Sequence, residues 1–496
     1  MNLLAPILTP FLTALLCLAA WRMRRLQGWL TVVGMGIMLY TAYGLFINVR
    51  TKGIMSLQMG NWSAPFGITL SADLLSCIML IMAAIIGLAV SFYSIASVDR
   101  DRQSFGFYPL FNLLIFGVAG AFVAGDIFNL YVWFEIMLIA SFVMLALGGK
   151  KEQLEGSIKY VAINFLSSGF FLAGVAILYS ITGTLNMAHL AQQAEVVPEK
   201  GLLAIASVFF LIAFGIKAAV FPLFFWLPAS YHTPPVAVTA IFSGLLTKVG
   251  VYALIRMFSL IFVFDISYTH TILMILSALT MIVGVLGPII HNDFRRILSF
   301  HIISQIGYII MGLAIFSPLA LAGSIFFIMH IILVKTNLFL ISGIVHHLKG
   351  SFKLRFAGGI YRDYPWLAFL FLVPALALAG LPPFSGFWAK IILIKASIDA
   401  ELFWLMFVAL GVSLLTLYSM TKIWNEVFWA SEAEAKDNSE HFATSPGPLW
   451  MMVLPVVFLV GCTLVIGLYP APFFKLAEET ALQLLNRNEY IKAILH

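Results

Sequence analysis

Residues 214–235 read FGIKAAVFPLFFWLPASYHTPP. Lys217 lies here in an apolar run that would otherwise suit the interior of a bilayer, and Pro222 interrupts a helix because proline lacks a backbone N–H. A broken helix exposes carbonyls and amides, which is tolerated at membrane depth only beside protein or a water-filled cavity. The stretch therefore predicts a membrane helix that is broken beside an internal polar path.

The composition extends this prediction to the whole chain. Of 496 residues, 62% are apolar and 10% are charged, against roughly 25% charged in an average soluble domain. Such a chain has too few charged side chains to cover the water-exposed surface of a soluble protein, which excludes soluble enzymes and nucleic-acid binders.

Runs of about 20 apolar residues predict fourteen transmembrane helices, and hence an all-α polytopic membrane protein. The predicted spans are 3–21, 28–49, 70–97, 108–124, 126–147, 157–181, 203–228, 235–258, 269–290, 294–315, 318–345, 364–397, 402–428 and 449–469, followed by a polar helix or tail from about 472.

The basic residues predict the orientation of the chain. Sixteen of the 28 Lys and Arg residues fall in loops on one side, eight, including Arg256, fall on the other, and four lie within spans. Cytoplasmic loops are enriched in Lys and Arg. We therefore expect both termini to face outside and the loop at 346–363 to be cytoplasmic.

Spans four to eight (108–258) and nine to thirteen (269–430) form two blocks of five helices. An odd number of helices inverts the second block relative to the first, and inverted repeats are typical of transporters. The fourth helix of each block, the seventh and the twelfth span, carries a break at Pro222 or at Pro382 and Pro383.

The rest of the chain flanks these repeats. Residues 1–107 are predicted as a three-helix segment, and residues 431–496 as a cytoplasmic loop, the last transmembrane helix and a C-terminal tail. The acidic run Glu426, Glu432, Glu434, Asp437 and Glu440 is expected to be a solvated cytoplasmic loop.

Glu135 is the single carboxylate that lies deep within a predicted span. A charge at mid-membrane costs at least about 2.5 kcal/mol and marks proton relays and ion sites, although a structural ion pair is the alternative. Desolvation disfavours a protonated lysine and a nearby carboxylate favours it. We therefore expect Glu135 and Lys217 to form a coupled pair in which Glu135 controls whether Lys217 holds its proton.

Three further ionisable residues lie within the spans. Lys248 is placed mid-span between glycines, and snorkelling to an interface is its alternative role. His330 and Lys335 share the eleventh span at a spacing that does not put them on one face. A histidine titrates near neutral pH, which suits a central relay, although a satisfied structural histidine is the alternative.

Lys390 follows the second break, where Pro382, Pro383 and Gly386 interrupt the helix. We expect it to be the terminal proton donor of the second block. Because no carboxylate lies deep in that block, Lys390 should release its proton more readily than Lys217. In the tenth span His301, Ser304 and Gln305 can hold water along the path.

No cofactor or metal is expected. Cys17, Cys77 and Cys462 lie far apart without histidines at metal-ligand spacing, and no nucleotide-binding glycine motif is present.

Three stretches carry a resemblance to a known family: GDIFNLYVWFEIMLIAS (125–141), the opening stretch (214–235) and ALAGLPPFSGFWAKIILI (377–394). They resemble the antiporter-like subunits shared by Mrp-type multisubunit sodium/proton antiporters and respiratory complex I, and most closely the D-type subunits of the Mrp branch. The resemblance covers essentially the whole chain.

The resemblance implies fourteen helices with two inverted five-helix repeats. It also implies a proton path through half the membrane, formed by a glutamate in the fifth span and lysines in the seventh, eighth and twelfth. These roles fall on Glu135, Lys217, Lys248 and Lys390, and His330 matches the residue that bridges the two halves. Some complex I relatives carry a glutamate at the position of Lys390, so the lysine favours the Mrp branch.

Three hypotheses follow for the function. The leading one is a proton-translocating subunit of a sodium/proton antiporter in the bacterial plasma membrane, a secondary transporter whose partners are the other Mrp subunits, membrane lipid, protons and sodium. The second is a proton-pumping membrane subunit of a complex I-like or membrane-bound hydrogenase complex. The third is a scaffold without a working path, against which the separated buried charges argue, because each is costly to retain.

Overall fold

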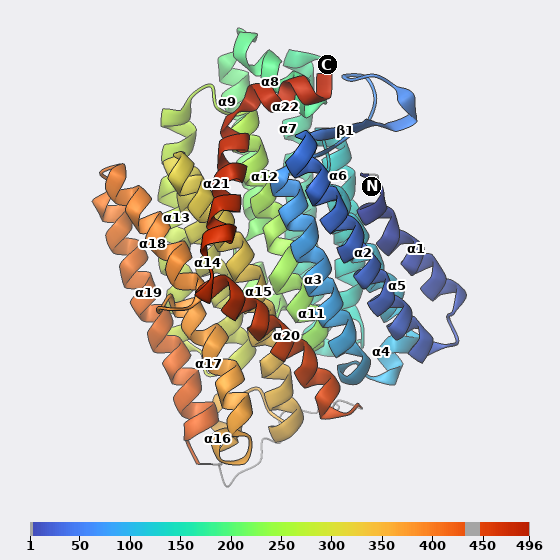
Figure 1. The fold of residues 1–496 in the computed structure, drawn as a ribbon, viewed down its shortest axis with the longest axis vertical. Helices are drawn as coiled ribbons and strands as arrows, with labels where there is room; N and C mark the ends of the chain where they lie inside the picture. Colours follow the sequence, from blue (N-terminus) through green and yellow to red (C-terminus); the bar gives the residue numbers. More distant parts are fainter. Residues whose placement is uncertain (1–2, 432–446, 496) are drawn as a thin grey trace.

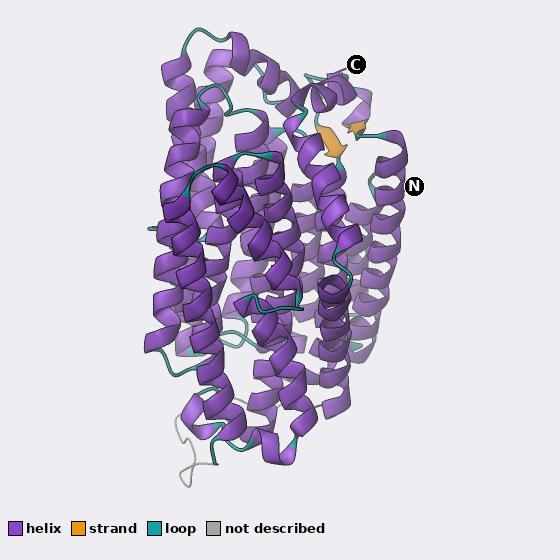
Figure 2. Ribbon diagram, turned by 60° about the vertical axis from the view of Figure 1, so that its left-hand side comes forward, coloured by secondary structure: helices purple, strands orange, loops and turns teal. Residues whose placement is uncertain are grey.

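The computed structural model, which describes residues 3–431 and 447–495, is a bundle of helices with a pair of short strands at one end (Figure 1, Figure 2). The elements before the first break are α1 (Ala5–Ala19), α2 (Arg24–Lys52), β1 (Met55–Gln58), η1 (Met59–Asn61), β2 (Thr69–Ala72), α3 (Leu74–Ser97), α4 (Arg100–Ser104), α5 (Phe107–Phe122), α6 (Ile127–Ala146), α7 (Lys151–Thr182), α8 (Met187–Val196) and α9 (Lys200–Ala218).

The elements between the two breaks are α10 (Trp226–Ser230), α11 (Val236–Ile241), the π segment η2 (Phe242–Leu246), α12 (Thr247–Leu260), α13 (Ile266–Ile290), α14 (Phe294–Ile315), α15 (Pro318–Lys349), η3 (Leu354–Phe356), α16 (Ile360–Asp363) and α17 (Pro365–Ala379). After the second break come α18 (Ser385–Asp399), α19 (Phe403–Ile423), the π segment η4 (Trp424–Trp429), α20 (Leu449–Leu468), α21 (Ala471–Leu485) and α22 (Arg487–Leu495).

The all-α polytopic prediction is confirmed. Over the described ranges, eleven helical stretches are long and apolar enough to cross a bilayer, and α1, α5 and α17 are shorter apolar helices. Each predicted span coincides with one of these helices or with a succession of helices across a break or a π segment. The count of fourteen spans, the inverted repeat and the segment boundaries stay predictions. The predicted acidic loop between 432 and 446 lies outside the described residues.

Both predicted helix breaks are present. Helix α9 ends at Ala218 and α10 begins at Trp226, whereas α17 ends at Ala379 and α18 begins at Ser385. The residues that end α9 and α17 are left-handed: Ala219 has φ +61° and Gly380 has φ +87°. This conformation is natural for glycine but costs alanine roughly 1–2 kcal/mol, so the surrounding packing must hold the first break in place.

Helix α15 is the centre of the molecule. Its apolar window is entirely buried, and it contacts α3, α11, η2, α14, α17, α18, α20 and α21. The Oγ of Ser317 accepts from the N–H of Ala320 at its start, and Gly350, at φ +76°, ends it. Because α15 contacts both predicted blocks, its polar residues are placed to connect them.

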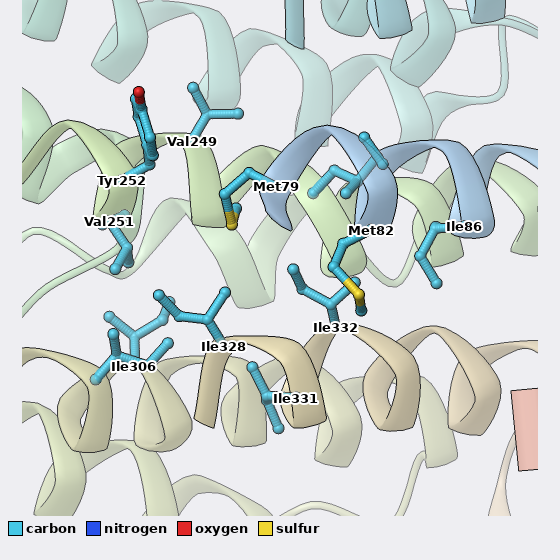
Figure 3. Close-up of a cluster of buried hydrophobic side chains, with 14 of the residues drawn as sticks. Met79, Met82, Ile86, Val249, Val251, Tyr252, Ile306, Ile328, Ile331 and Ile332 are labelled. Atoms are coloured by element: carbon cyan, nitrogen blue, oxygen red, sulfur yellow. The ribbon is translucent and has the colours of Figure 1, made fainter. Parts of the chain in front are cut away.

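Apolar side chains from four helices pack around this centre (Figure 3). Met79 and Met82 come from α3, Val249 and Val251 from α12, Ile306 from α14, and Ile328, Ile331 and Ile332 from α15; all are buried. Lipid tails are as apolar as these side chains, so tight packing rather than transfer out of water holds such a core together.

The chain after 472 is a helix, as predicted, but it is not a free tail. Helix α21 buries Ala477, Thr480, Ala481 and Leu484 and contacts α15, α12 and α3. Helix α22 lies across the end of the bundle near α8 and the strands (Figure 1). Both termini lie in the upper part of this view. The end that carries α8, α22 and the strands is called the terminal face below.

Candidate functional site

Lys217 lies in the last turn of α9, directly before the first break. Its side chain helps line a cavity of about 20 Å³ together with Tyr160, Asn164 and Trp226. A cavity of about 10–15 Å³ suffices for one water. The indole N–H of Trp226 donates to the carbonyl of Ile216 at 3.0 Å, which holds α10 against the end of α9. Phe134, Met137, Leu138 and Leu246 line the rest of the cavity, so the break leaves a largely apolar space of about the size of one water beside the lysine.

Glu135 does not contact Lys217 directly. Within the described residues no ion pair joins them, and the Nζ of Lys217 instead lies 5.7 Å from the ring centroid of Phe134. The Oγ of Ser168, on α7, donates to Oε1 of Glu135 at 2.5 Å. Glu135 is also less enclosed than expected, because its side chain is only partly buried. The coupled pair of Glu135 and Lys217 stays a prediction.

Lys248 is 1% exposed, and its Nζ donates at 2.5 Å to the carbonyl of Ser243 in the π segment. A π segment leaves backbone groups displaced from the regular helical pattern and is common at functional sites. Gly250 brings α12 onto the first break: a Cβ at this position would lie 2.9 Å from the carbonyl carbon of Lys217. Lys217 and Lys248 are therefore neighbours in space, and Lys248 does not snorkel to an interface.

His330 connects α15 to the second break. It is fully buried, and its Nδ1 forms a hydrogen bond of 2.8 Å with the Oγ of Ser385, the first residue of α18. Gly386 makes this approach possible, because a Cβ there would lie 2.9 Å from Nε2 of His330 and 1.9 Å from the carbonyl oxygen of Ala377. The predicted helix-breaking glycine is thus a packing requirement.

Lys335, one and a half turns further along α15, is also fully buried. Its only hydrogen bond among the described residues is a long one, 3.4 Å, from Nζ to the carbonyl of Leu298 on α14. It lies within range of the charges of both Lys248 and Lys390. Lys335 thus lies near one lysine of each predicted block, and its role in the path stays a prediction.

Lys390 is 4% exposed and is held more firmly than Lys217. Its Nζ donates to the carbonyls of Leu378 and Ala379, both at 3.0 Å, and lies 4.9 Å from the ring centroid of Tyr308. These carbonyls are the free C-terminal acceptors of α17, where the helix dipole favours a cation. Two freed carbonyls thus lie beside Lys390, whereas the first block has a carboxylate near Lys217. That Lys390 gives up its proton more readily than Lys217 stays a prediction.

Buried polar atoms without a protein partner surround these bases. Within the described chain they include Thr247 Oγ1, His301 Nδ1, Ser304 Oγ, both side-chain ends of Gln305 and of Asn337, and His330 Nε2. His301 does use its other nitrogen, in a 2.7 Å hydrogen bond to Ser419. Buried groups of this kind ordinarily bind ordered water. The predicted water-holding residues His301, Ser304 and Gln305 thus have buried polar atoms without a protein partner in the described chain, and the water path itself stays a prediction.

One buried charge pair was missed by the sequence analysis. Arg256 was assigned to a loop, but it lies within α12 and forms an ion pair with Asp73, at the start of α3. The signal was present in the spacing, because Lys248, Tyr252 and Arg256 follow one another at intervals of four residues on one helix face.

A basic cavity of about 940 Å³ opens on the face opposite the terminal face. Its lining includes Lys150, Lys151, Arg296, Lys353, Arg355 and His232. Burial and the neighbouring charges of Arg296 and Arg295 lower the pKa of His232 to about 3. The imidazole therefore stays neutral at physiological pH and contributes no charge to this basic cavity.

Residues 3–431 and 447–495 contain no group of three or more His, Cys, Asp or Glu side chains close enough to hold a metal ion. The proton path through Glu135, Lys217, Lys248, His330, Lys335 and Lys390 stays a prediction.

Comparisons with known proteins identify relatives along the full length. Residues 124–416 match the family described as "NADH:quinone oxidoreductase/Mrp antiporter, TM". The D subunit of the Na(+)/H(+) antiporter of Alkalihalophilus pseudofirmus is 45% identical over 99% of this chain and 98% of its own. The D subunit of the Na(+)/H(+) antiporter of Bacillus subtilis is 39% identical, again over 99% of this chain and 98% of its own. A chain of the Mrp complex from Dietzia sp. DQ12-45-1b superposes with a TM-score of 0.92, at 32% identity, over 100% of this chain and 99% of its own.

Proposed function

Because the chain belongs to the NADH:quinone oxidoreductase/Mrp antiporter transmembrane family, we propose that it is a proton-translocating subunit of a multisubunit Na⁺/H⁺ antiporter. It is a secondary transporter subunit: the movement of ions down their gradients, rather than a chemical reaction, supplies the energy. Its partners are the other subunits of the Mrp complex, its location is a bacterial plasma membrane, and its termini face outside.

One observation carries the proposal. Four buried or partly buried lysines run from the first break to the second, and none forms an ion pair with a carboxylate in the described chain: Lys217, Lys248, Lys335 and Lys390. An unpaired buried ammonium is costly. The neutral amine is therefore close in free energy to the charged ammonium. Proton transfer needs such a base, which can be either charged or neutral.

In the proposed mechanism a proton moves between neighbouring bases through water. Each transfer turns one ammonium into an amine and the next amine into an ammonium. Adjacent positive charges in a dry interior repel each other, so a proton that arrives on one lysine favours release from the next. Glu135 biases Lys217 towards its charged form, and the carbonyls of Leu378 and Ala379 do the same for Lys390. His330 and Lys335 transfer protons between the two blocks.

Sodium/proton exchange by the complete complex in proteoliposomes tests this function. We expect an imposed proton gradient to drive sodium transport, and Lys217→Ala and Lys248→Ala to abolish it in complexes that still assemble. Full exchange with Lys217→Ala would disprove the path.

The alternative, a pump subunit of a redox complex, predicts a different result in the same vesicles. Such a subunit would move protons only when electron donor and acceptor are supplied. Exchange in the absence of any redox substrate therefore separates the two functions.

A further inference from the structure

Asp73 and Arg256 form an ion pair that the path described so far does not use. Oδ2 of Asp73 lies 2.6 Å from a terminal guanidinium nitrogen of Arg256, and the side chains are 3% and 4% exposed. Asp73 precedes α3, and Arg256 lies in the last two turns of α12, so the pair lies near the terminal face. It joins two helices where the membrane interior meets that face.

Polar groups connect this pair to the rest of α12. Arg256 donates to the hydroxyl of Tyr252 at 3.1 Å, and this hydroxyl donates to the carbonyl of Phe122 at 2.6 Å. The Oγ of Ser76 lies 3.0 Å from the same hydroxyl. Figure 3 shows the Tyr252 hydroxyl directed away from the apolar side chains of α15. The hydroxyl thus belongs to a polar stripe on α12, formed by Lys248, Tyr252 and Arg256, rather than to the apolar core.

The stripe continues to the proposed path. Lys248, Tyr252 and Arg256 lie on one face of α12 at successive turns, each about 6 Å further along the axis. Two groups near its end have no protein partner in the described chain, Nε of Arg256 and Oγ of Ser259. Both are at least nine-tenths buried. Such groups ordinarily bind water, which would extend the stripe into a continuous polar route.

The C-terminal helices cover the pair. The ring centroid of Tyr490, on α22, lies 5.2 Å from the guanidinium carbon of Arg256, and its hydroxyl forms a 2.9 Å hydrogen bond with Ser71. The side chain of Gln483 accepts from the N–H of Leu74 at 2.9 Å, next to Asp73. Arg487 donates to the carbonyl of Leu260 at 2.8 Å, at the end of α12. These bonds fix α21 and α22 over the ends of α3 and α12.

We propose that Asp73 is the proton-exchanging carboxylate at the terminal face of the first block, with Arg256 as its charge partner and α22 as its cover. The proposal rests on the proposed function. In the step, the Lys248 ammonium gives a proton to water, and that water gives a proton to the Tyr252 oxygen. The original O–H proton of Tyr252 leaves the carbonyl of Phe122, passes through a second water and binds the Asp73 carboxylate, so that Tyr252 is a neutral phenol before and after the step. Lys248 becomes a neutral amine, Asp73 becomes a neutral acid, and Arg256 keeps its charge between the rings of Tyr252 and Tyr490. The proton then leaves to the terminal face.

A purely structural role makes a different prediction. Replacing both members of a buried ion pair by neutral residues is often harmless to folding, whereas removing one member leaves an uncompensated charge. A structural pair can therefore be neutralised as a pair, and a proton-exchanging carboxylate cannot. The double variant Asp73→Asn/Arg256→Gln uses this difference, because asparagine still caps α3 and can hydrogen-bond to glutamine.

The experiment measures sodium/proton exchange by the complete complex in proteoliposomes, after assembly has been checked. We expect the double variant to assemble and to lose exchange by about a hundredfold, as when a positioned proton donor or acceptor is removed. The matched control is Arg50→Gln/Glu479→Gln, which neutralises an exposed pair between α2 and α21 at 3.2 Å and should transport normally. Normal exchange by an assembled Asp73→Asn/Arg256→Gln complex overturns the proposal.

Asp73→Glu provides a second test should the double variant fail to assemble. A longer carboxylate in this site should keep exchange active but displace its pH profile, whereas an unchanged profile overturns the proposal. The charged and titratable groups around position 73 are the same in the wild-type and the Asp73→Glu complex: Arg256, Tyr252, Tyr490 and Cys77. Failure of the proposed function itself would appear separately, as a wild-type complex without exchange or an active Lys217→Ala complex.

Discussion

The buried lysines differ in what holds them, and Lys390 is held most firmly. It donates to two backbone carbonyls, whereas Lys217 has no hydrogen-bond partner in the described chain and faces a small cavity. Glu135, which we propose to control Lys217, accepts a hydrogen bond from Ser168. The two lysines thus have different surroundings at the two breaks.

Lys390→Arg separates the two roles of this residue. Arginine can still donate to the carbonyls of Leu378 and Ala379, but it does not lose its proton. We expect the complex to assemble and sodium/proton exchange to fall by about a hundredfold or more. Lys395→Arg, at an exposed position of the same helix, is the matched control. Wild-type exchange by Lys390→Arg would mean that Lys390 only caps α17.

His232 predicts a dependence of stability on pH. Its Nδ1 donates to the carbonyl of Pro228 at 2.8 Å and its Nε2 accepts from Arg296 at 3.1 Å. The bond from Arg296 needs the neutral ring, because a protonated Nε2 cannot accept a hydrogen bond. Its pKa is lowered from 6.5 to about 3. Between these values the unfolded chain binds the proton and the folded chain does not, so stability is complete above about pH 6.5 and falls as the pH is lowered towards 3.

The melting temperature of the purified complex between pH 7 and pH 4 measures this effect. We expect His232→Gln to reduce the loss of stability on acidification, since glutamine takes up no proton. An acid-induced loss identical to that of the wild type would contradict the assignment.

At the scale of elements, the two helix breaks depend on close packing by glycine. The contact between α12 and the end of α9 exists because Gly250 has no side chain, and the contact between α17 and α18 exists because Gly386 has none. Proline interrupts each helix, but glycine lets a neighbouring helix come near enough for its base to reach the break.

Gly250→Ala tests this dependence. The added Cβ would lie 2.7 Å from the backbone nitrogen of Ala218 and 3.0 Å from Cβ of Lys217. Overpacking of this kind costs about 1–3 kcal/mol, so we expect a lower melting temperature and impaired exchange. Gly169→Ala in α7 is the matched control: no atom lies within 4 Å of the new Cβ, and alanine is the better helix former. Equal behaviour of the two variants would contradict the packing argument.

At the scale of the whole molecule, the bundle has two unlike faces. The terminal face carries the strands, α8 and α22 over the Asp73–Arg256 pair, and the opposite face opens into the basic cavity. An excess of Lys and Arg is typical of cytoplasmic surfaces. The cavity therefore supports the predicted orientation, with Arg256 removed from the loop count because it is buried and paired.

Cysteine labelling on intact cells tests the orientation. In a chain with Cys462 replaced, we expect an impermeant maleimide to label Glu199→Cys, between α8 and α9, from outside. Arg355→Cys, an exposed position in the basic cavity, should react only after permeabilisation. The reverse pattern would mean that both termini face the cytoplasm.

The sequence by itself determined the class of the protein, the two breaks and the positions of the buried bases. Apolar runs, prolines and charges act locally, so their effects can be recognised without knowing the fold: residues 214–235 already contained a broken membrane helix with a lysine beside the break. The prediction of a buried path from Glu135, Lys217, Lys248 and Lys390 needed no more than this, together with the family resemblance.

Only the tertiary structure decided what each charge meets. Ser168 for Glu135, the carbonyls of α17 for Lys390, and Asp73 for Arg256 all lie on other helices. Such partners are brought together by helix packing, which depends on the shape of whole faces rather than on any local pattern. For the same reason the sequence placed Arg256 in a loop and the C-terminal residues in a tail. In the packed bundle Arg256 is buried beneath the C-terminal helices.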